Sequence, residues 1–460
     1  MTIVSTNPAT GEELSRHTLH SDTDVEAVLD AAVRAQADWR RRTVTERTPL
    51  LRAVARVLRE GRDEYAALIT AEMGKPVAEA LGEIDKCAWT CEHYADHAAS
   101  YLADCPVASD AAESAVVYDP LGVVLAIMPW NYPFWQFFRF AAPALAAGNA
   151  TLLKHANNVP QCALAVEDVL RKAGAPEGLC RTLLIGVDRI AGLIADSRVA
   201  AVTLTGSTQV GAIVAAQAAA QLKKQVLELG GSDPFIVLAD ADVAQAAATA
   251  VKARFVNNGQ SCVNAKRFIV EEAVADEFAQ LFTAHVAALT VGDPTDPATD
   301  LGPLARPDLR ATLHDQVTRS VAAGAKVLLG GDLPDGTGAF YPPTVLDHVI
   351  PGTAAFDEET FGPLAALIRV PDAETALTLA NQTEYGLGAA LWTRDVDRAR
   401  DLSRRLDAGA VFVNGMVASD PRLPFGGIKK SGYGRELGAE GIREFVNTKT
   451  VWIGPKTEAA

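Results

Sequence analysis

The stretch from residue 121 to residue 230 alternates strand-like apolar runs with helical runs, and this pattern constrains the fold more than any other feature of the chain. LGVVLAI (121–127) and ATLLK (150–154) are typical of strands, and an Ala-rich helical segment follows the first of them. Alternating strands and helices form βαβ units with a parallel sheet. The pattern therefore predicts an α/β fold whose ligands bind at the carboxyl ends of the strands.

The rest of the chain divides into three further regions. Residues 23–103 have the composition and apolar spacing of helices. A second α/β segment begins near Gly231, and its strand and helix signals continue to about residue 415. The tail contains Gly-rich turns and ends in FVNTKTVWIG (445–454), which is typical of a strand.

Charge and composition exclude several classes of protein. A net charge of -15 without a long basic run disfavours binding to nucleic acid or an anionic membrane. The N-terminus does not resemble a signal peptide, and no apolar run approaches the ~20 residues of a membrane span. Six cysteines in 460 residues indicate a reducing, cytoplasmic setting.

One cluster raises the question of a metal. Cys87, Cys91, His93 and His97 lie in a segment that is typical of a helix. Zinc sites favour tight Cys-x-x-Cys turns with a second ligand pair elsewhere, and the sequence contains no such second pair. We therefore expect half-buried helix residues here and no metal site.

Polar residues follow several of the predicted strands. Asn131 and Lys154 come after the first and second strands, and Glu228 ends the fifth. Gly206 and Ser207 lie between a strand and a helix, where free N–H groups attract phosphate, although an ordinary Ser cap would look the same. Glu228 would serve as a general base if burial raised its pKa, and otherwise it is a solvated loop acid.

Cys262 lies in FVNNGQSCVNAKR (255–267), among amides and glycine instead of apolar residues. A reactive thiol needs access and hydrogen-bond donors around it, whereas a buried structural cysteine needs neither. We interpret the loop as a polar, accessible site, and the local sequence alone leaves a structural cysteine open.

Seven stretches together give the chain its resemblance to the aldehyde dehydrogenase superfamily over essentially its full length. They are PWNYP (129–133), LLKHA (152–156), TGSTQVG (205–211), LELGGSDP (227–234), NNGQSC (257–262), EETFGP (358–363) and PFGGIKKSGYGRE (424–436). The resemblance implies an α/β fold with a Rossmann-type cofactor domain (1–98 and 121–230), an α/β catalytic domain (231–440) and a small β oligomerisation hairpin (99–120 and 441–460). It also implies a homo-oligomer, either a dimer or a tetramer.

The resemblance implies a catalytic trio. Cys262 would attack the aldehyde carbon, and Asn131 with the backbone N–H of Cys262 would form the oxyanion hole. Glu228 would activate the water that hydrolyses the resulting thioester.

The resemblance also implies a nicotinamide cofactor. Where many members carry an acidic residue that rejects a 2′-phosphate, this chain has Asn157, so we expect NADP to be preferred, with NAD as the alternative. Lys154 and His155 would help to bind the phosphate. The implied cofactor residues are Trp130, Lys154, Asn157, Gly206, Ser207, Gly211, Leu229, Glu359 and Phe361.

Two residues suggest the substrate. Arg139 and Ser419 resemble the residues that succinate-semialdehyde dehydrogenases use to contact the distal carboxylate. Val256 stands where some relatives have a second substrate arginine, which puts the strength of this selection in doubt. Asn264 replaces a second cysteine of some relatives, so we expect no disulfide switch.

Four alternatives stay open at this point. The first is another aldehyde, either glutarate semialdehyde or an uncharged aliphatic one. A CoA-acylating enzyme and a non-catalytic binding relative are disfavoured, because the chain has Glu228 and retains Cys262 and Asn131 with it. The fourth alternative, a thiol hydrolase, is disfavoured because such an enzyme would not use the cofactor motifs.

Overall fold

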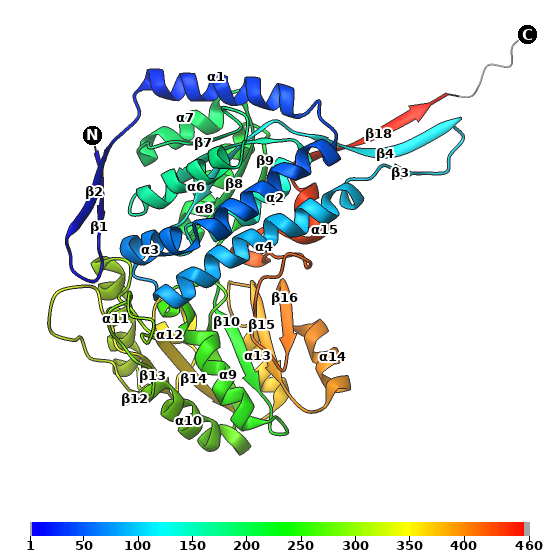
Figure 1. The fold of residues 1–460 in the computed structure, drawn as a ribbon. Coiled ribbons are helices and arrows are strands. Elements are labelled where there is room, and N and C mark those ends of the chain that lie inside the picture. Colours follow the sequence, from blue (N-terminus) through cyan, green and yellow to red (C-terminus); the bar gives the residue numbers. More distant parts are fainter. Residues whose placement is uncertain (1, 455–460) are drawn as a thin grey trace, which may run out of the picture.

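Two sheets with helices packed on them form the two lobes of the molecule (Figure 1). The computed structural model describes residues 2–454. The chain opens with a hairpin and four helices, α1 and α2 each starting at a capping box formed by Ser21 with Asp24 and by Thr43 with Glu46. These elements are β1 (Thr2–Thr6), β2 (Glu13–Thr18), α1 (Asp22–Trp39), α2 (Val44–Glu60), α3 (Arg62–Met73) and α4 (Val77–Tyr101).

The first sheet confirms the predicted alternation of strands and helices. Its order is β17-β9-β8-β5-β6-β7, with β5 to β9 parallel and β17 antiparallel to β9. The strands are β5 (Val123–Met128), β6 (Ala150–His155), β7 (Cys180–Thr182), β8 (Val199–Thr205), β9 (Lys224–Glu228) and β17 (Gly432–Tyr433). The helices are α5 (Trp135–Ala147), α6 (Pro160–Lys172), α7 (Ile190–Ala195) and α8 (Thr208–Ala220). The strand order reverses between β5 and β8, where open α/β sheets bind ligands.

The second sheet forms the other lobe in the order β12-β13-β14-β11-β10-β15-β16. All neighbouring strands are parallel except β12 and β13. The strands are β10 (Asp233–Val237), β11 (Ala265–Glu271), β12 (Lys326–Leu329), β13 (Thr344–Asp347), β14 (Leu364–Val370), β15 (Gly388–Trp392) and β16 (Ala410–Val413). The helices are α9 (Val243–Phe255), α10 (Glu272–Ala287), α11 (Pro307–Ala322), α12 (Ala354–Asp357), α13 (Ala373–Asn381) and α14 (Val396–Arg405), and α15 (Gly438–Arg443) follows after the chain has returned to the first lobe.

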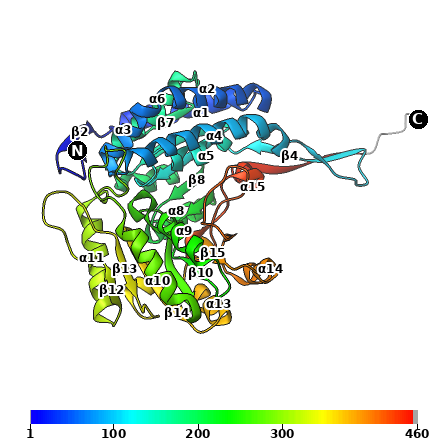
Figure 2. The same ribbon diagram turned by 60° about the horizontal axis from the view of Figure 1, so that its bottom comes forward.

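A three-stranded antiparallel arm projects from the first lobe (Figures 1 and 2). It consists of β3 (Cys105–Pro106), β4 (Glu113–Pro120) and β18 (Val446–Ile453), with β4 in the middle. The predicted C-terminal strand is therefore confirmed. Residues 99–101 of the predicted hairpin segment belong to helix α4, and residues 455–460 lie outside the described residues.

Two features of the described chain bear on membranes and metals. Within residues 2–454, no helix is both long and apolar enough to cross a membrane. Nor does this range hold a group of three or more His, Cys, Asp or Glu side chains that could bind a metal ion. Cys87 and Cys91 are fully buried in α4, and the rings of His93 and His97 stack with centroids 4.4 Å apart.

Candidate active site

A cavity of about 500 Å³ opens at the carboxyl ends of β5, β6 and β8, where the parallel sheet was expected to bind its ligand. Nine of the fourteen predicted site residues line it: Trp130, Asn131, Lys154, Gly206, Ser207, Leu229, Cys262, Glu359 and Phe361. The other five, Glu228, Asn157, Gly211, Arg139 and Ser419, are not part of its wall. The cavity therefore joins residues from both lobes.

The loop before Cys262 is a buried scaffold, and our interpretation of its amides as an accessible polar surface is wrong. Asn257 and Asn258 adopt left-handed backbone conformations, with φ of 58° and 56°, and both are almost fully buried. The Asn258 side chain donates to the carbonyls of Gly74 and Pro303, each at 2.9 Å. These amides hold the loop in place by satisfying buried backbone groups. Asn tolerates left-handed backbone better than most residues, which explains its presence at both positions.

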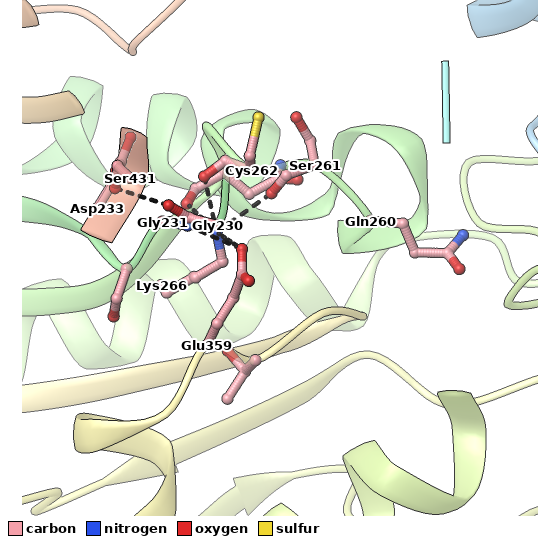
Figure 3. Close-up of polar contacts among 12 residues, drawn as sticks. Gly230, Gly231, Asp233, Gln260, Ser261, Cys262, Lys266, Glu359 and Ser431 are labelled. Carbon is pink, nitrogen blue, oxygen red and sulfur yellow. Dashed lines mark hydrogen bonds and ion pairs between the residues drawn. The ribbon is translucent and has the colours of Figure 1, made fainter. Parts of the chain in front are cut away.

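Cys262 itself is half-buried at the cavity wall. Its sulfur points away from Lys266 and Glu359 (Figure 3). Burial raises the pKa of the thiol to about 12, while the positive charges of Arg139 and Lys266 lower it. The thiol is therefore protonated at neutral pH in the structure without ligands, and a base must accept its proton before it can attack.

Lys266 contacts the backbone of Cys262, and the sequence analysis did not identify this lysine as a site residue. Its ammonium donates to the Cys262 carbonyl at 2.8 Å and lies 3.7 Å from the Glu359 carboxylate (Figure 3). Glu359 in turn accepts the Gly231 N–H at 2.9 Å. Lys266 is 1% exposed in strand β11, where a lysine among buried positions is the signal that could have found it.

Asn131 lies beside the cysteine loop as predicted. Its Nδ2 donates to the Gln260 carbonyl at 3.0 Å, and its backbone carbonyl accepts from Asn257 Nδ2 at 2.9 Å. An amide nitrogen carries two hydrogens, so the second can point to a ligand atom. The side chain is only 5% exposed, and its orientation is therefore set by the loop.

Glu228 ends strand β9 and is 2% exposed, so it is a buried acid and not a solvated loop residue. Within the described part of the chain, neither of its carboxylate oxygens has a hydrogen-bond partner. Burial raises its pKa well above the usual range, the Arg139 charge lowers it, and the Glu436 charge raises it further. The Glu228 charge in turn raises the pKa of the Cys262 thiol, which makes the two groups a candidate pair for proton transfer.

Arg139 has a protein carboxylate as its partner. It forms a buried ion pair with Glu436, and its guanidinium carbon lies 4.6 Å from the centre of the Phe425 ring. Its Nη2 also donates to the Thr205 hydroxyl at 3.4 Å. The arginine is 2% exposed. The ion pair uses Nε of the guanidinium, and the substrate contact expected from the sequence stays a prediction.

Ser419 lies on the loop before β17 and contacts a residue that the sequence reasoning did not consider. Lys86 of helix α4 donates to the Ser419 hydroxyl at 2.7 Å. The Lys86 ammonium also lies 4.4 Å from the centre of the Trp135 ring. Lys86 and Ser419 are both half-buried, so both remain partly open to solvent.

Lys154 and Asn157 form one polar pair at the other end of the cavity. Lys154 Nζ donates to Asn157 Oδ1 at 2.7 Å, and burial lowers the lysine pKa to about 8. Asn157 is exposed. The His155 ring is fully engaged, because Nε2 lies 2.9 Å from the Pro133 carbonyl and Nδ1 accepts the Ala156 N–H. Burial also lowers its pKa to about 4, so the expected help of His155 in binding a phosphate is wrong.

The remaining predicted residues shape the middle of the cavity. Ser207 caps helix α8, its hydroxyl accepting the Val210 N–H at 3.4 Å. Gly211 lies behind the wall, because a side chain there would overlap Leu229. Trp130 and Phe361 meet edge to face with ring centroids 5.7 Å apart. The site thus combines a thiol, a free amide donor, a buried carboxyl group and a helix N-terminus beside an open cavity.

Comparison with known proteins gives consistent matches. The Aldehyde dehydrogenase family profile matches residues 1–451. A probable succinate-semialdehyde dehydrogenase (NADP+) of Synechocystis sp. is 54% identical over 98% of this chain and 100% of its own length. The succinate semialdehyde dehydrogenase (NAD(P)+) Sad of Escherichia coli is 49% identical over 98% of this chain and 97% of its own. The structure of succinic semialdehyde dehydrogenase from Streptococcus pyogenes in complex with NADP+ superposes with a TM-score of 0.96 at 37% identity, covering 98% of this chain and 100% of that one.

Proposed function

Because the chain belongs to the aldehyde dehydrogenase family, we propose that it oxidises succinate semialdehyde, or a similar short aldehyde with a distal carboxylate, to the acid with NADP+ as the electron acceptor. One observation supports the reaction class. A single cavity is lined both by Cys262 and by the strand-end residues Gly206 and Ser207 at the N-terminus of α8. The substrate and cofactor rest on relatives near 50% identity that carry these names over nearly full length.

The cavity suits a dinucleotide with a 2′-phosphate. Gly206 lines the cavity just before the start of α8, where free N–H groups attract a pyrophosphate. Val187 and Val210 line the wall although they are 71% and 43% exposed, and they offer an apolar slot for an adenine ring. Lys154 and Asn157 would hold the phosphate on the ribose, because one supplies charge and the other amide hydrogens.

The other half of the cofactor would lie toward Cys262. Glu359 is the carboxylate that would accept hydrogen bonds from the nicotinamide ribose, and Trp130 and Phe361 would border the ring. Leu229 adds an apolar contact from the strand end. When bound, NADP+ supplies the acceptor that takes a hydride from the aldehyde carbon.

Cys262 would act as the nucleophile. Loss of its proton to Glu228 gives a thiolate, which attacks the aldehyde carbon and forms a thiohemiacetal. The oxyanion that develops would accept hydrogen bonds from Asn131 Nδ2 and from the backbone N–H of Cys262. The loop of buried amides keeps both donors fixed, so little reorganisation is needed during the reaction.

Glu228 would act a second time as the base for hydrolysis, once it has released the thiol proton to solvent and is a carboxylate again. After oxidation the acyl group is held as a thioester on Cys262, and water must be deprotonated to release the acid. Burial raises the pKa of this carboxyl group well above its ordinary value, which makes its carboxylate form a stronger base. The two-step route replaces one difficult conversion by two easier ones.

We also propose that the arm of β3, β4 and β18 serves assembly, with the first sheet as the cofactor-binding domain and the second as the catalytic domain. Trp452 and Ile453 are 52% and 51% exposed at the end of the arm. Exposed apolar residues on an unpaired strand edge favour pairing with a second copy.

Product analysis tests the proposed function. Incubation with succinate semialdehyde and NADP+ should give NADPH and succinate in equal amounts, and Cys262→Ala should give neither. A product that appears only when coenzyme A is added would instead indicate an acylating enzyme. Loss of substrate without NADPH would contradict the redox chemistry altogether.

A further inference from the structure

Lys266 is a buried cation that joins two separate parts of the site. It lies near the start of β11, and its ammonium donates to the carbonyls of Ser261 and Cys262, at 3.2 and 2.8 Å (Figure 3). The same ammonium lies 3.7 Å from the Glu359 carboxylate, which belongs to the loop before β14. Cys262 and Glu359 both line the cavity. One side chain thus connects the loop of the thiol to an acid of a second loop.

This position is costly for a lysine. Burial lowers the pKa of the Lys266 ammonium, while the charges of Glu359 and Asp233 raise it. A buried charge needs both a counter-ion and hydrogen bonds, and Glu359 and the surrounding carbonyls, with that of Asn264 at 3.4 Å, supply them. An apolar residue would fill the same space without the cost of burying a charge. The contacts therefore indicate a role in the site beyond packing.

The two carboxylate oxygens of Glu359 have different surroundings. Oε1 accepts the Gly231 N–H at 2.9 Å and faces Lys266. Within residues 2–454, no hydrogen bond uses Oε2, and this oxygen lies next to Gly230 in the cavity wall, where a side chain would overlap it. Lys266 and Gly231 therefore fix the carboxylate through one oxygen and leave the other for a ligand.

Lys266 also acts on the thiol through its charge. Burial raises the pKa of Cys262, the charges of Arg139 and Lys266 lower it, and those of Glu228 and Glu359 raise it. The thiolate is the reactive form of a cysteine, so a nearby cation that favours this form increases the reactivity of the thiol.

We propose that Lys266 is a positioning residue that holds Glu359 and the backbone of Cys262 in a fixed relation and favours the thiolate by its charge. This inference rests on the proposed function, because it concerns the same reaction. Hydride transfer needs the carbon bound to Cys262 to stay close to the nicotinamide, whose ribose Glu359 would hold. A residue that contacts both holders keeps the two reacting groups aligned without touching either of them.

Alkylation by iodoacetamide tests the effect on the thiol without cofactor or aldehyde. Cys105 is exposed, so mass spectrometry of both cysteine peptides gives the rate at Cys262 relative to an internal reference. Lys266→Met should slow the relative alkylation of Cys262 about tenfold at neutral pH, because the thiolate becomes rarer. Glu359→Gln should have the opposite effect and accelerate it, because an acid that disfavours the thiolate is removed.

The first turnover tests the alignment. With NADP+ and succinate semialdehyde, Lys266→Met should lower the single-turnover rate of NADPH formation about 100-fold, more than the alkylation rate, because alignment is lost as well as thiolate. Glu359→Gln should also lower the NADPH rate, although its thiol reacts faster. Lys223→Met is the matched control and should change neither rate. Lys223 also donates to two backbone carbonyls, those of Ile194 and Asp196, each at 2.6 Å, but it precedes β9 at the edge of the sheet away from the cavity.

The outcomes separate the inference from the function. Lys266→Met with the unsubstituted alkylation rate, or with equal losses of alkylation and of NADPH formation, would overturn the inference. Slower alkylation in both variants would also overturn it, because it would show that the pair only supports the fold. Glu359 is partly exposed and glutamine has the same shape, so Glu359→Gln gives a result even if Lys266→Met does not fold. If the unsubstituted enzyme forms no NADPH from succinate semialdehyde, the proposed function fails, whereas the alkylation rates still decide whether Lys266 acts on the thiol.

Discussion

Substitution of Asn157 is the most direct test of which cofactor the enzyme prefers. The substitution Asn157→Asp keeps the size of the side chain and changes only its charge. In the structure Asn157 Oδ1 accepts from Lys154 Nζ at 2.7 Å, so an aspartate would form an ion pair with the same lysine. Its negative charge would then lie where the 2′-phosphate of NADP+ is proposed to bind.

The size of the effect follows from Coulomb's law. The phosphate carries about -1.5 to -2 charges at neutral pH. At ~4 Å, each pair of unit charges interacts by about 1 kcal/mol in water and about 4 kcal/mol near a protein surface. Because Asn157 is exposed, we take a penalty of roughly 2 to 3 kcal/mol, which corresponds to a loss of roughly 30- to 150-fold in kcat/KM for NADP+.

The assay is the initial rate of nicotinamide reduction at varied NADP+ and varied NAD+ with a fixed aldehyde. NAD+ lacks the phosphate, so its kcat/KM should stay within a few-fold, and Asn157→Ala should reduce NADP+ use far less than Asn157→Asp. Equal losses for both cofactors would refute the reasoning, since they would show a structural effect. An unchanged NADP+ preference would refute the placement of the phosphate.

Three further predictions follow, two on the buried acid and one on the arm. Glu228→Gln should give at most one NADPH per active site and then stop, because the thioester is no longer hydrolysed, and this NADPH should form slowly because the thiol has also lost its base; steady turnover in stopped-flow traces would contradict the assignment. A carboxyl group with a raised pKa in the folded state stabilises the fold while protonated and loses this contribution as pH rises above its ordinary pKa and through the raised one, so Glu228→Gln should remove part of the fall in unfolding temperature over that pH range; identical pH profiles would argue against a buried, unpaired Glu228. Replacing Trp452 and Ile453 by serine should lower the mass in light scattering without loss of the fold, because it removes exposed apolar residues at the end of the arm, and an unchanged assembly would exclude these two side chains from the interface.

Much of the fold could be predicted from local sequence pattern. The alternation of strands and helices in residues 121–230 is a local signal, and the sheet that contains β5 to β9 follows it. The residues after β5, β6 and β8 meet at one edge because parallel strands place their carboxyl ends together. The short hairpin β1–β2 and the two-residue strand β17 carry too little periodicity to be predicted.

The polar partners of the site could not be predicted in the same way. Lys86 meets Ser419 across a sequence separation of 333 residues, and Arg139 meets Glu436 from opposite parts of the chain. Nothing in the local sequence around Arg139 or Lys86 indicates that Arg139 pairs with a buried carboxylate while Lys86 contacts a hydroxyl group. The buried amides before Cys262 were also misjudged, because their role is to satisfy backbone groups of distant loops.

The most direct test of the account compares kcat/KM for succinate semialdehyde, glutarate semialdehyde and butanal with NADP+ and with NAD+, measured by the absorbance of the reduced nicotinamide. We expect succinate semialdehyde with NADP+ to be the best pair and butanal to be used about tenfold less efficiently or worse, because butanal has no carboxylate to bind a cation. Equal efficiency for all three aldehydes would contradict the carboxylate site while leaving the chemistry of Cys262 and Glu228 intact.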